Sequence, residues 1–329
     1  MWSADRFVDG ASGIAEYFGL SPLIIGLTVV SIGTSAPEIF VSANAALDAS
    51  SGIAVGNALG SNLANMGLVL GITALICPLA VNPTPARREG VIMLLVCFAA
   101  GAVLFDSFLG RIESLALVFC LGLFITYLIR TSSKDSEQAT DAIDTSANAE
   151  LQDTTDQAAK ASTSSKTSTS SKTSTTSLTR ASLTTAYGLI LLVVSARVLV
   201  WSASGIASNF GVSDLVIGVT VVAVGTSLPE LAASLSSAFK GQSDIAIGNV
   251  LGSNIFNFLA VLPVAGIIFP MQVDGINFYR DFGAVLLLSV LFIGACLWKT
   301  RTGEKGVLGR PSGVVLLAIY ASYYYLLLA

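Results

Sequence analysis

The 329-residue sequence contains no histidine, and only 12% of its residues are charged. Histidine is central to zinc enzymes and to proton relays near neutral pH, so its absence excludes both classes. An ordinary soluble domain carries about 25% charged residues. With 53% hydrophobic residues and a mean hydropathy of +0.76, this chain cannot cover a water-facing surface, and we expect it to lie in a membrane.

Charge and cysteine content exclude further partners and chemistries. The formal net charge is −4, with no basic excess, so nucleic acid is not expected as a partner. The four cysteines lie in apolar runs without the spacing of metal ligands, and we interpret them as buried small hydrophobic side chains. No nucleophile–base set, phosphate-binding loop or cofactor motif is present, so the sequence predicts neither an enzyme nor a bound cofactor.

Long apolar runs fill most of the chain. About twenty apolar residues span a bilayer as a helix. The sequence contains ten apolar stretches, of which the first is shorter and amphipathic, and it therefore predicts an all-α, polytopic membrane protein with about ten transmembrane helices. The stretches lie at roughly 3–18, 23–47, 53–80, 90–106, 112–130, 183–208, 214–239, 245–270, 281–299 and 311–328.

Residues 131–180 interrupt this pattern. They include 24 Ser or Thr residues and no aromatic residue, and they cannot bury enough surface to fold. We expect a disordered linker at 131–180, which separates a first half at 1–130 from a second half at 181–329.

The two halves are copies of one unit. Adding 192 to a position in the first half gives its partner in the second without a gap. GLTVVSIGTSAPE at 26–38 matches GVTVVAVGTSLPE at 218–230, and GNALGSN at 56–62 matches GNVLGSN at 248–254. Over 21–42 and 52–65, 22 of 36 positions are identical. Five helices in each half require the second copy to enter the membrane upside down, and inverted repeats form substrate sites where the copies meet.

The first helix is shorter than its partner. Ser3 and Ala4 pair with Ser195 and Ala196, but the stretch at 183–208 begins well before that point. The first half therefore lacks an equivalent of residues 183–194. Either the first helix is shortened or the chain begins upstream of Met1, and we favour the second explanation.

Lysine and arginine in the loops indicate the orientation. Alternation of the spans places nine of them on the side of the linker and only Arg111 and Arg280 on the other. Positively charged loops remain in the cytoplasm. We therefore expect a protein of the inner (cytoplasmic) membrane, monomeric in the lipid bilayer, with a cytoplasmic linker and both termini outside.

Two acidic residues, Glu38 and Glu230, occupy equivalent positions inside long apolar stretches with no Lys or Arg nearby. Ionisable groups within a membrane are costly and usually functional. Two carboxylates brought together at low dielectric repel each other, and either a proton or a bound cation relieves the repulsion. The structural alternative is that each Glu is protonated and hydrogen-bonds a neighbouring helix.

Hydroxyl oxygens precede each carboxylate at helical spacing. On the first copy, Ser31, Ser35 and Glu38 are predicted to lie on one helical stripe. We interpret these hydroxyl groups as candidate ion ligands. They are Ser31, Thr34 and Ser35 before Glu38, and Thr226 and Ser227 before Glu230.

Prolines next to the carboxylates suggest broken helices. Pro37 and Pro229 have no N–H to donate to the carbonyl four residues earlier. We expect backbone carbonyls nearby, including those of Ser31 and Ala223, to turn inward, because unpaired backbone at this depth lines a cavity or binds something. A simple proline kink relieved by Thr or Ser is the alternative.

A second pair of helices adds amide and hydroxyl groups. Ser61 and Asn65, and likewise Ser253 and Asn257, are four residues apart in apolar surroundings. They are either ion ligands or polar contacts between helices. An all-oxygen set of donors suits hard cations. Two Glu carboxylates and several neutral oxygens would satisfy Ca²⁺, which takes six to eight oxygens, and Na⁺ would compete for the same atoms.

These motifs resemble those of a known family. GTSAPE (33–38) with GTSLPE (225–230), and GNALGSNLAN (56–65) with GNVLGSNIFN (248–257), are similar to the two α-repeats of the sodium/calcium exchangers, within the Ca²⁺:cation antiporter superfamily. The chain is most similar to the bacterial inner-membrane branch. The resemblance implies a fold of ten helices in two inverted repeats, with exchange of Ca²⁺ for Na⁺. The ion ligands that it implies are Glu38, Glu230, Thr34, Ser35, Thr226, Ser227, Ser61, Ser253, Asn65, Asn257 and the carbonyls of Ser31 and Ala223.

One position separates branches of this family. Members that also transport K⁺ tend to carry Asp where this chain has Asn257, so the resemblance implies exchange that is independent of K⁺. Three other functions remain open on the residues alone: Ca²⁺/H⁺ exchange through the same two carboxylates, a passive cation channel, and a membrane scaffold without transport.

Overall fold

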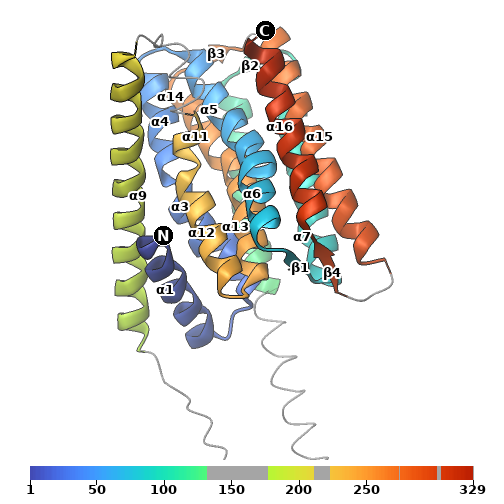
Figure 1. Cartoon of the computed structure of the whole chain (residues 1–329). Helices are drawn as coiled ribbons and strands as arrows, with labels where there is room; N and C mark the ends of the chain where they lie inside the picture. Colours follow the sequence, from blue (N-terminus) through green and yellow to red (C-terminus); the bar gives the residue numbers. More distant parts are fainter. Residues whose placement is uncertain (132–176, 211–222, 274, 302–304, 329) are drawn as a thin grey trace, which may run out of the picture.

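The computed structural model describes residues 1–131, 177–210, 223–273, 275–301 and 305–328. Its helices run roughly parallel and antiparallel to one common axis (Figure 1). The predicted all-α membrane fold is confirmed, since short strands are the only other regular structure in the described residues. The predicted linker falls largely on residues outside the described ranges.

The first half begins with a helix that is followed by a broken one. α1 covers Trp2–Phe18. The broken helix consists of α2 (Pro22–Ile25), the π-helical turn η1 (Gly26–Val30), α3 (Ser31–Thr34) and α4 (Ala36–Leu47). The remaining elements are α5 (Ser51–Ala64), the π-helical turn η2 (Asn65–Val69), α6 (Leu70–Ile76), β1 (Leu79–Val81), α7 (Pro83–Val103), β2 (Phe108–Leu109) and a helix at Arg111–Thr131.

The second half repeats this order. It begins with α9 (Leu178–Asn209), which takes in the last three residues of the predicted linker, and Ala181 in its first turn is already buried against α1. The elements that follow are α11 (Ala223–Thr226), α12 (Leu228–Phe239), α13 (Ser243–Phe256), the π-helical turn η4 (Asn257–Val261), α14 (Leu262–Ile268), β3 (Met271–Gln272), α15 (Gly275–Lys299), β4 (Gly306–Leu308) and α16 (Arg310–Leu328).

The repeat in the sequence is a repeat in the fold. Shifting α4, α5 and α6 by 192 residues gives the bounds of α12, α13 and α14 at both ends. Even the π-helical turns coincide, since η2 begins at Asn65 and η4 at Asn257. Equal sequences thus adopt equal local structure in both halves.

Two small sheets show that the copies are inverted. β1 pairs antiparallel with β4, and β2 pairs antiparallel with β3. By the offset of 192 residues, Leu79 of β1 corresponds to Met271 of β3. The sheet β1·β4 nevertheless lies at the bottom of the molecule and β2·β3 at the top (Figure 1). Equivalent strands therefore sit at opposite ends, as the odd number of helices in each half predicted.

Among the described residues, five helices are long and apolar enough to cross a membrane, or six when the pair Pro22–Thr34 and Ala36–Leu47, bent by 42°, counts as one span. Each of the ten predicted stretches is mostly helical where it is described, although the stretch 53–80 ends in the strand β1. Several of the other stretches form helices that are too short or too interrupted to cross a membrane as one straight helix. The 17-residue helix α1 is an example.

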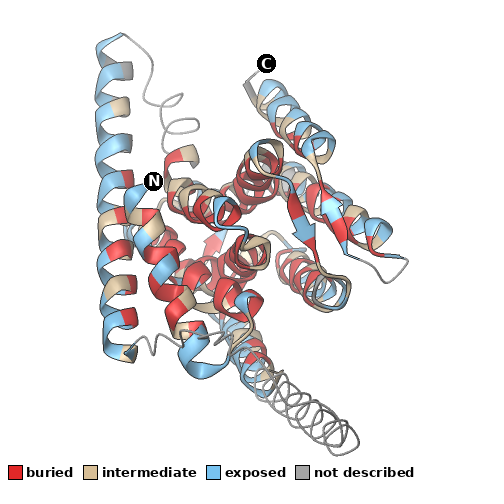
Figure 2. Cartoon of the chain, turned by 60° about the horizontal axis from the view of Figure 1, so that its bottom comes forward, coloured by how far each residue is buried: buried red, intermediate tan, exposed pale blue. Residues whose placement is uncertain are grey.

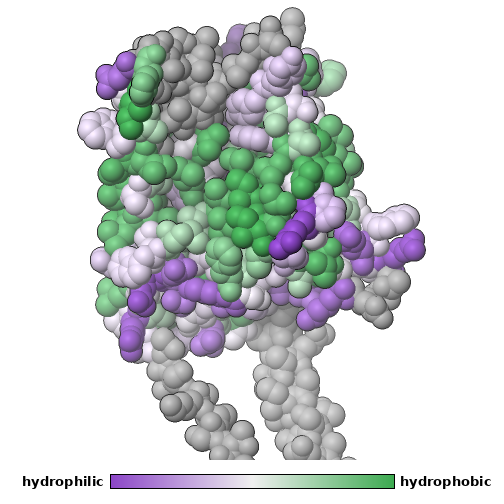
Figure 3. Space-filling view, viewed as in Figure 1, coloured by the Kyte–Doolittle hydropathy of each residue, from purple (hydrophilic) through white to green (hydrophobic). Residues whose placement is uncertain are grey.

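The surface agrees with a membrane setting. Large apolar side chains point outward, as Ile112 (80% exposed) and Phe119 (66% exposed) do on the helix Arg111–Thr131. In the space-filling view, apolar residues cover the middle of the visible face and hydrophilic residues gather toward its lower end (Figure 3). Such an apolar surface is expected to face lipid.

The motif-bearing helices form the centre of the bundle. Most of the span Ser243–Ile268 is buried (78%), as is most of Gly52–Ile76 (72%), whereas only 18% of Leu178–Ala203 is buried. Figure 2 shows this contrast, with α9 largely exposed at one edge. The centre of the fold is therefore built from the segments that carry the predicted ligands.

The prediction for the cysteines is partly corrected. All four are free, as expected. Cys97 and Cys296 are buried, but Cys77 and Cys120 are half-buried. A residue in an apolar run of a membrane helix is not necessarily in the core, because lipid also accepts apolar side chains.

Candidate ion-binding site

Both acidic residues lie in the first turn of a helix that follows a break. Ser35 (φ −84°, ψ 0°) separates α3 from α4, and Ser227 (φ −87°, ψ 5°) separates α11 from α12. Pro37 and Pro229 lie directly before Glu38 and Glu230 in these first turns. A helix start carries partial positive charge on its free N–H groups, which favours a carboxylate there.

Glu38 and Glu230 are both fully buried, and Ser35, three residues before Glu38, is hydrogen-bonded to Glu230. Both side-chain oxygens of Glu38 and Oε2 of Glu230 have no hydrogen-bond partner among the described residues. A buried, unpaired carboxylate is costly. The pair therefore needs protons or a cation.

The break corrects one prediction about the first copy. Ser31, Ser35 and Glu38 do not lie on one continuous helix, because the chain bends at Ser35. The carbonyl of Ser31 is also not unpaired: it accepts a hydrogen bond from Ser35 N at 2.9 Å and a longer one from Thr34 Oγ1 at 3.4 Å. Its predicted role as a free carbonyl ligand is not supported by this geometry.

Side chains from the two halves meet across the centre. Ser35 Oγ donates to Glu230 Oε1 at 3.3 Å. Thr34 Oγ1 donates to Asn249 Oδ1 at 3.2 Å and lies 3.5 Å from Ser253 Oγ. Hydroxyl groups beside Glu38 in the sequence therefore contact residues around Glu230.

Two asparagines hold the helices that carry the carboxylates. Asn57 Nδ2 donates to the carbonyl of Glu38 at 3.0 Å and to Ser42 Oγ at 2.9 Å. In the second half, Asn249 Nδ2 donates to the carbonyl of Glu230 at 3.2 Å and to Ser234 Oγ at 2.9 Å. The two arrangements are equivalent under the repeat. They position each acidic helix turn against α5 or α13.

Amide groups at the π-helical turns contribute further oxygens. Asn65 and Asn257 open η2 and η4 and are fully buried. Asn257 Nδ2 donates to Asn62 Oδ1 at 3.0 Å, which leaves Asn257 Oδ1 without a partner among the described residues. Single π-helical turns are rare and occur mostly at functional sites.

Taken together, the buried oxygens without a partner in the described part of the chain form a set that suits a hard cation. No group of three or more His, Cys, Asp or Glu side chains suited to a metal occurs in that part, and the candidate donors are two carboxylates and neutral oxygens. On the predicted site residues, the unpartnered oxygens are Glu38 Oε1 and Oε2, Glu230 Oε2, Ser61 Oγ, Ser227 Oγ, Asn65 Oδ1 and Asn257 Oδ1, while Asn254 Oδ1 and the Tyr320 hydroxyl are unpartnered elsewhere in that part.

Most predicted site residues are buried at the centre, but not all are joined by direct contacts. Ser31, Thr34, Ser35, Ser61, Asn65, Ser227, Ser253 and Asn257 are buried. Thr226 in α11 is half-buried, and Ala223 is described only as the first residue of that helix. Sequence reasoning assigned no role to Ser42 and Ser234, which support Asn57 and Asn249, although their equivalence under the repeat was a usable signal.

Known proteins resemble this chain over most of its length. The family model described as "Sodium/calcium exchanger protein" matches residues 1–131 and 181–329. The inner membrane protein YrbG of Escherichia coli (strain K12) is 38% identical over 316 residues, which cover 96% of this chain and 89% of that protein. The sodium/calcium exchanger MaX1 of Methanosarcina acetivorans is 32% identical over 345 residues, covering 97% and 93%.

A solved structure is also similar. The sodium–calcium exchanger NCX_Mj, soaked with Na⁺ and Ca²⁺, superposes with a TM-score of 0.75 at 30% identity, covering 98% of this chain and 93% of that chain.

Proposed function

Because the chain belongs to the sodium/calcium exchanger family and is thus a transporter and not an enzyme, we propose that it exchanges Ca²⁺ for Na⁺ across the cytoplasmic membrane by alternating access. The observation that carries this proposal is the burial of Glu38 and Glu230, one from each inverted copy, among oxygens without partners.

Charge balance explains why the ions would compete. One Ca²⁺ neutralises two carboxylates, whereas Na⁺ must enter in more than one copy to do the same. Both ions use carboxylate, hydroxyl and amide oxygens. A carrier whose single site is filled by one or the other couples their movements, so that a Na⁺ gradient drives Ca²⁺ in the opposite direction.

Uptake of ⁴⁵Ca²⁺ into proteoliposomes loaded with Na⁺ tests the proposal. We expect uptake to require the Na⁺ gradient and to fall to the level of empty liposomes in Glu38→Gln and in Glu230→Gln, because a neutral amide cannot balance the divalent charge. Glu16→Gln is the matched control, since Glu16 is exposed on α1. Uptake that persists in both site variants would refute the proposal.

Proton exchange is the competing coupling through the same carboxylates. A carboxylate without a partner can take a proton in place of a cation. Ca²⁺ uptake driven by a pH gradient in the absence of Na⁺ would favour Ca²⁺/H⁺ exchange. Flux down the Ca²⁺ gradient with no counter-ion would instead indicate a channel.

We further propose that K⁺ is not required. Asn257 is a neutral amide and donates to Asn62, so the centre holds no third carboxylate there to balance an additional cation. Replacing K⁺ by choline on both sides is expected to leave the Na⁺-driven rate unchanged.

The orientation and oligomeric state are part of the same proposal. Nine of the eleven basic residues counted in the loops are on the side of the linker, and this excess supports a cytoplasmic linker with both termini outside. One chain supplies both carboxylates, so a monomer in the bilayer is sufficient for exchange.

A further inference from the structure

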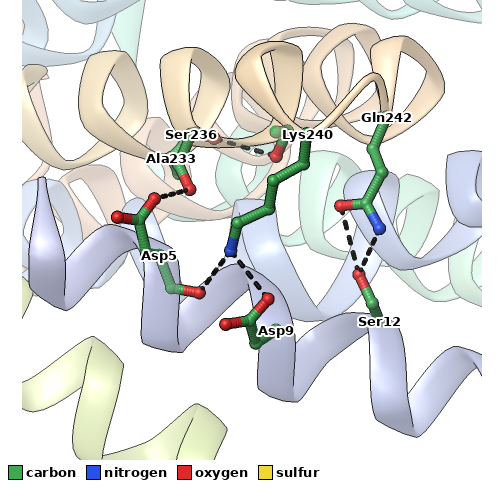
Figure 4. A network of polar contacts seen from close by, with 8 residues as sticks. Asp5, Asp9, Ser12, Ala233, Ser236, Lys240 and Gln242 are labelled. Atoms are coloured by element: carbon green, nitrogen blue, oxygen red, sulfur yellow. Dashed lines mark hydrogen bonds and ion pairs between the residues drawn. The ribbon is translucent and has the colours of Figure 1, made fainter.

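A polar network joins α1 to the end of α12 (Figure 4). Lys240 Nζ donates to the carbonyl of Asp5 and to Asp9 Oδ1, each at 2.7 Å. Ser236 Oγ donates to Asp5 Oδ1 at 2.6 Å. Ser236 and Lys240 are four residues apart, as are Asp5 and Asp9. The three hydrogen bonds therefore join one turn of α1 to the last turn of α12.

A second contact extends the network to the start of α13. Gln242 Nε2 donates to Ser12 Oγ at 3.0 Å. Ser12 is three residues after Asp9 on α1, and Gln242 directly precedes α13. The network therefore fixes α1 against both helices of the second half that carry predicted ligands.

One short helix connects this network to the candidate site. Glu230 lies in the first turn of α12, and Lys240 directly follows its last residue, Phe239. A 12-residue helix is about 18 Å long and moves as a rigid unit. A displacement of α1 from Lys240 is therefore linked mechanically to the helix that carries the carboxylate.

The inverted copy contains part of this pattern with the charges exchanged, although the position equivalent to Asp9 is the uncharged Trp201. In the network above, an acidic residue of the peripheral helix meets two hydrogen-bond donors on the helix after the break. At the equivalent positions of the other copy, a basic residue on the peripheral helix corresponds to two residues with acceptor oxygens, also four apart on the helix after the break. The residues equivalent to Asp5, Ser236 and Lys240 are Arg197, Asn44 and Asp48.

This second set is not engaged. The guanidinium of Arg197 lies over the ring of Phe40, 5.3 Å from its centroid, and Asn44 Nδ2 donates to the carbonyl of Phe40 at 2.7 Å. Within the described residues, no hydrogen bond or ion pair joins Arg197 to Asp48.

Packing shows the same asymmetry between the peripheral helices. Phe7 of α1 is fully buried, whereas its equivalent on α9, Leu199, is 57% exposed. The surface along this part of α9 is open and mostly apolar, with residues such as Val194 and Val198 exposed. Part of this difference follows from the shorter first helix, because the backbone of Phe7 packs against Gly188 of α9 and the described residues of α1 contain no equivalent of Gly188.

We propose that the two sets are alternating latches: Asp5, Asp9, Ser236 and Lys240 hold the linker-side end closed, and Arg197 engages Asn44 and Asp48 when that end opens. The proposal rests on alternating access in the proposed function. Inverted repeats reach the opposite-facing state when each copy takes the conformation of the other, so a contact made in one copy is exchanged for its equivalent.

The strength of the first latch suits this role. The Lys240–Asp9 pair is partly exposed, with 27% and 52% of the two side chains accessible. Exposed ion pairs are weakly stabilising. Such a contact biases an equilibrium between two conformations without preventing either.

Opposite shifts in two variants test the proposal. Lys240→Met removes the first latch, and Asp48→Asn weakens the second. In lipid nanodiscs without ion gradients, we expect amide hydrogen exchange in α1 to rise by about 1.5-fold to fivefold in Lys240→Met and to fall in Asp48→Asn, as removal of a surface ion pair shifts a two-state equilibrium by about this factor. Lys299→Met, a change to an exposed lysine at the end of α15, is the control and should leave α1 unchanged.

A charge exchange separates a latch from a merely structural contact. The double variant Asp9→Lys with Lys240→Asp should return exchange in α1 toward the value of the unaltered protein. Shifts of α1 in the same direction in Lys240→Met and Asp48→Asn, or no rescue by the double variant, would overturn the latches. Because hydrogen exchange needs no transport, the readout distinguishes failure of the latches from failure of Na⁺/Ca²⁺ exchange.

Discussion

The hydroxyl of Ser35 in the first copy donates a hydrogen bond to Oε1 of Glu230 in the second, at 3.3 Å. The equivalent pair, Ser227 and Glu38, makes no such bond, since Ser227 Oγ and both carboxylate oxygens of Glu38 are without a partner in the described residues. The two halves share a sequence pattern but not a set of contacts. The site is therefore asymmetric, as a protein caught in one of two opposite conformations should be.

Ser35→Ala is expected to destabilise the ion-free protein more than Ser227→Ala. The first removes a donor from a buried carboxylate and should lower the free energy of unfolding by about 1–3 kcal/mol. The second removes a hydroxyl with no partner in the described residues and should cost less than about 0.5 kcal/mol. Thermal unfolding of both purified variants without Ca²⁺ or Na⁺ measures the difference. Equal losses would contradict the assigned asymmetry.

Asn249→Ala is expected to lower stability more than Asn57→Ala. Both asparagines hold the turn that carries a carboxylate, but Asn249 also accepts the bond from Thr34. One additional buried hydrogen bond is worth about 1 kcal/mol in the free energy of unfolding. The comparison is made by thermal unfolding, with the exposed residue Asn209 changed to Ala as a control. A larger loss in Asn57→Ala would show that the Thr34 contact adds nothing.

Gly248→Ala is expected to disturb the crossing between the broken helix and α13. A methyl group there would lie 2.6 Å from the carbonyl oxygen of Leu23 and 3.1 Å from Cα of Gly26, both backbone atoms. Gly90 is the matched control within a helix, because a methyl group there would only meet the flexible side chain of Ile293 at 3.3 Å. We expect overpacking to cost about 1–3 kcal/mol at Gly248 and much less at Gly90. Melting temperatures in detergent compare the two, and similar values would argue against a close crossing.

Much of the fold could be predicted because the repeat has no gap. The offset of 192 residues transfers every helix boundary from α4–α6 to α12–α14, and the odd number of helices in each half predicts the inversion. Glu38 and Glu230 were found for the same reason: a charged residue repeated inside two apolar runs is too costly to be incidental.

Backbone detail was not accessible in the same way. A π-helical turn at Asn65 shifts hydrogen bonds by one residue without a sequence signal, and β2 is only two residues long. The carbonyl of Ser31 was predicted to turn inward, but Ser35 N satisfies it, because the bend occurs after Thr34. Both copies carry nearly the same residues. The repeat therefore cannot predict which of two equivalent contacts, such as Ser35–Glu230 and Ser227–Glu38, is formed.

The two small sheets have a consequence for how the molecule is assembled. At each end a strand from the first half is hydrogen-bonded to a strand from the second, β1 with β4 and β2 with β3. Backbone hydrogen bonds therefore join the two halves at both ends of the molecule, and none of these strands includes residues 131–180. Two polypeptides produced separately, one ending and the other beginning within that segment, should still recognise each other and recombine into one working carrier.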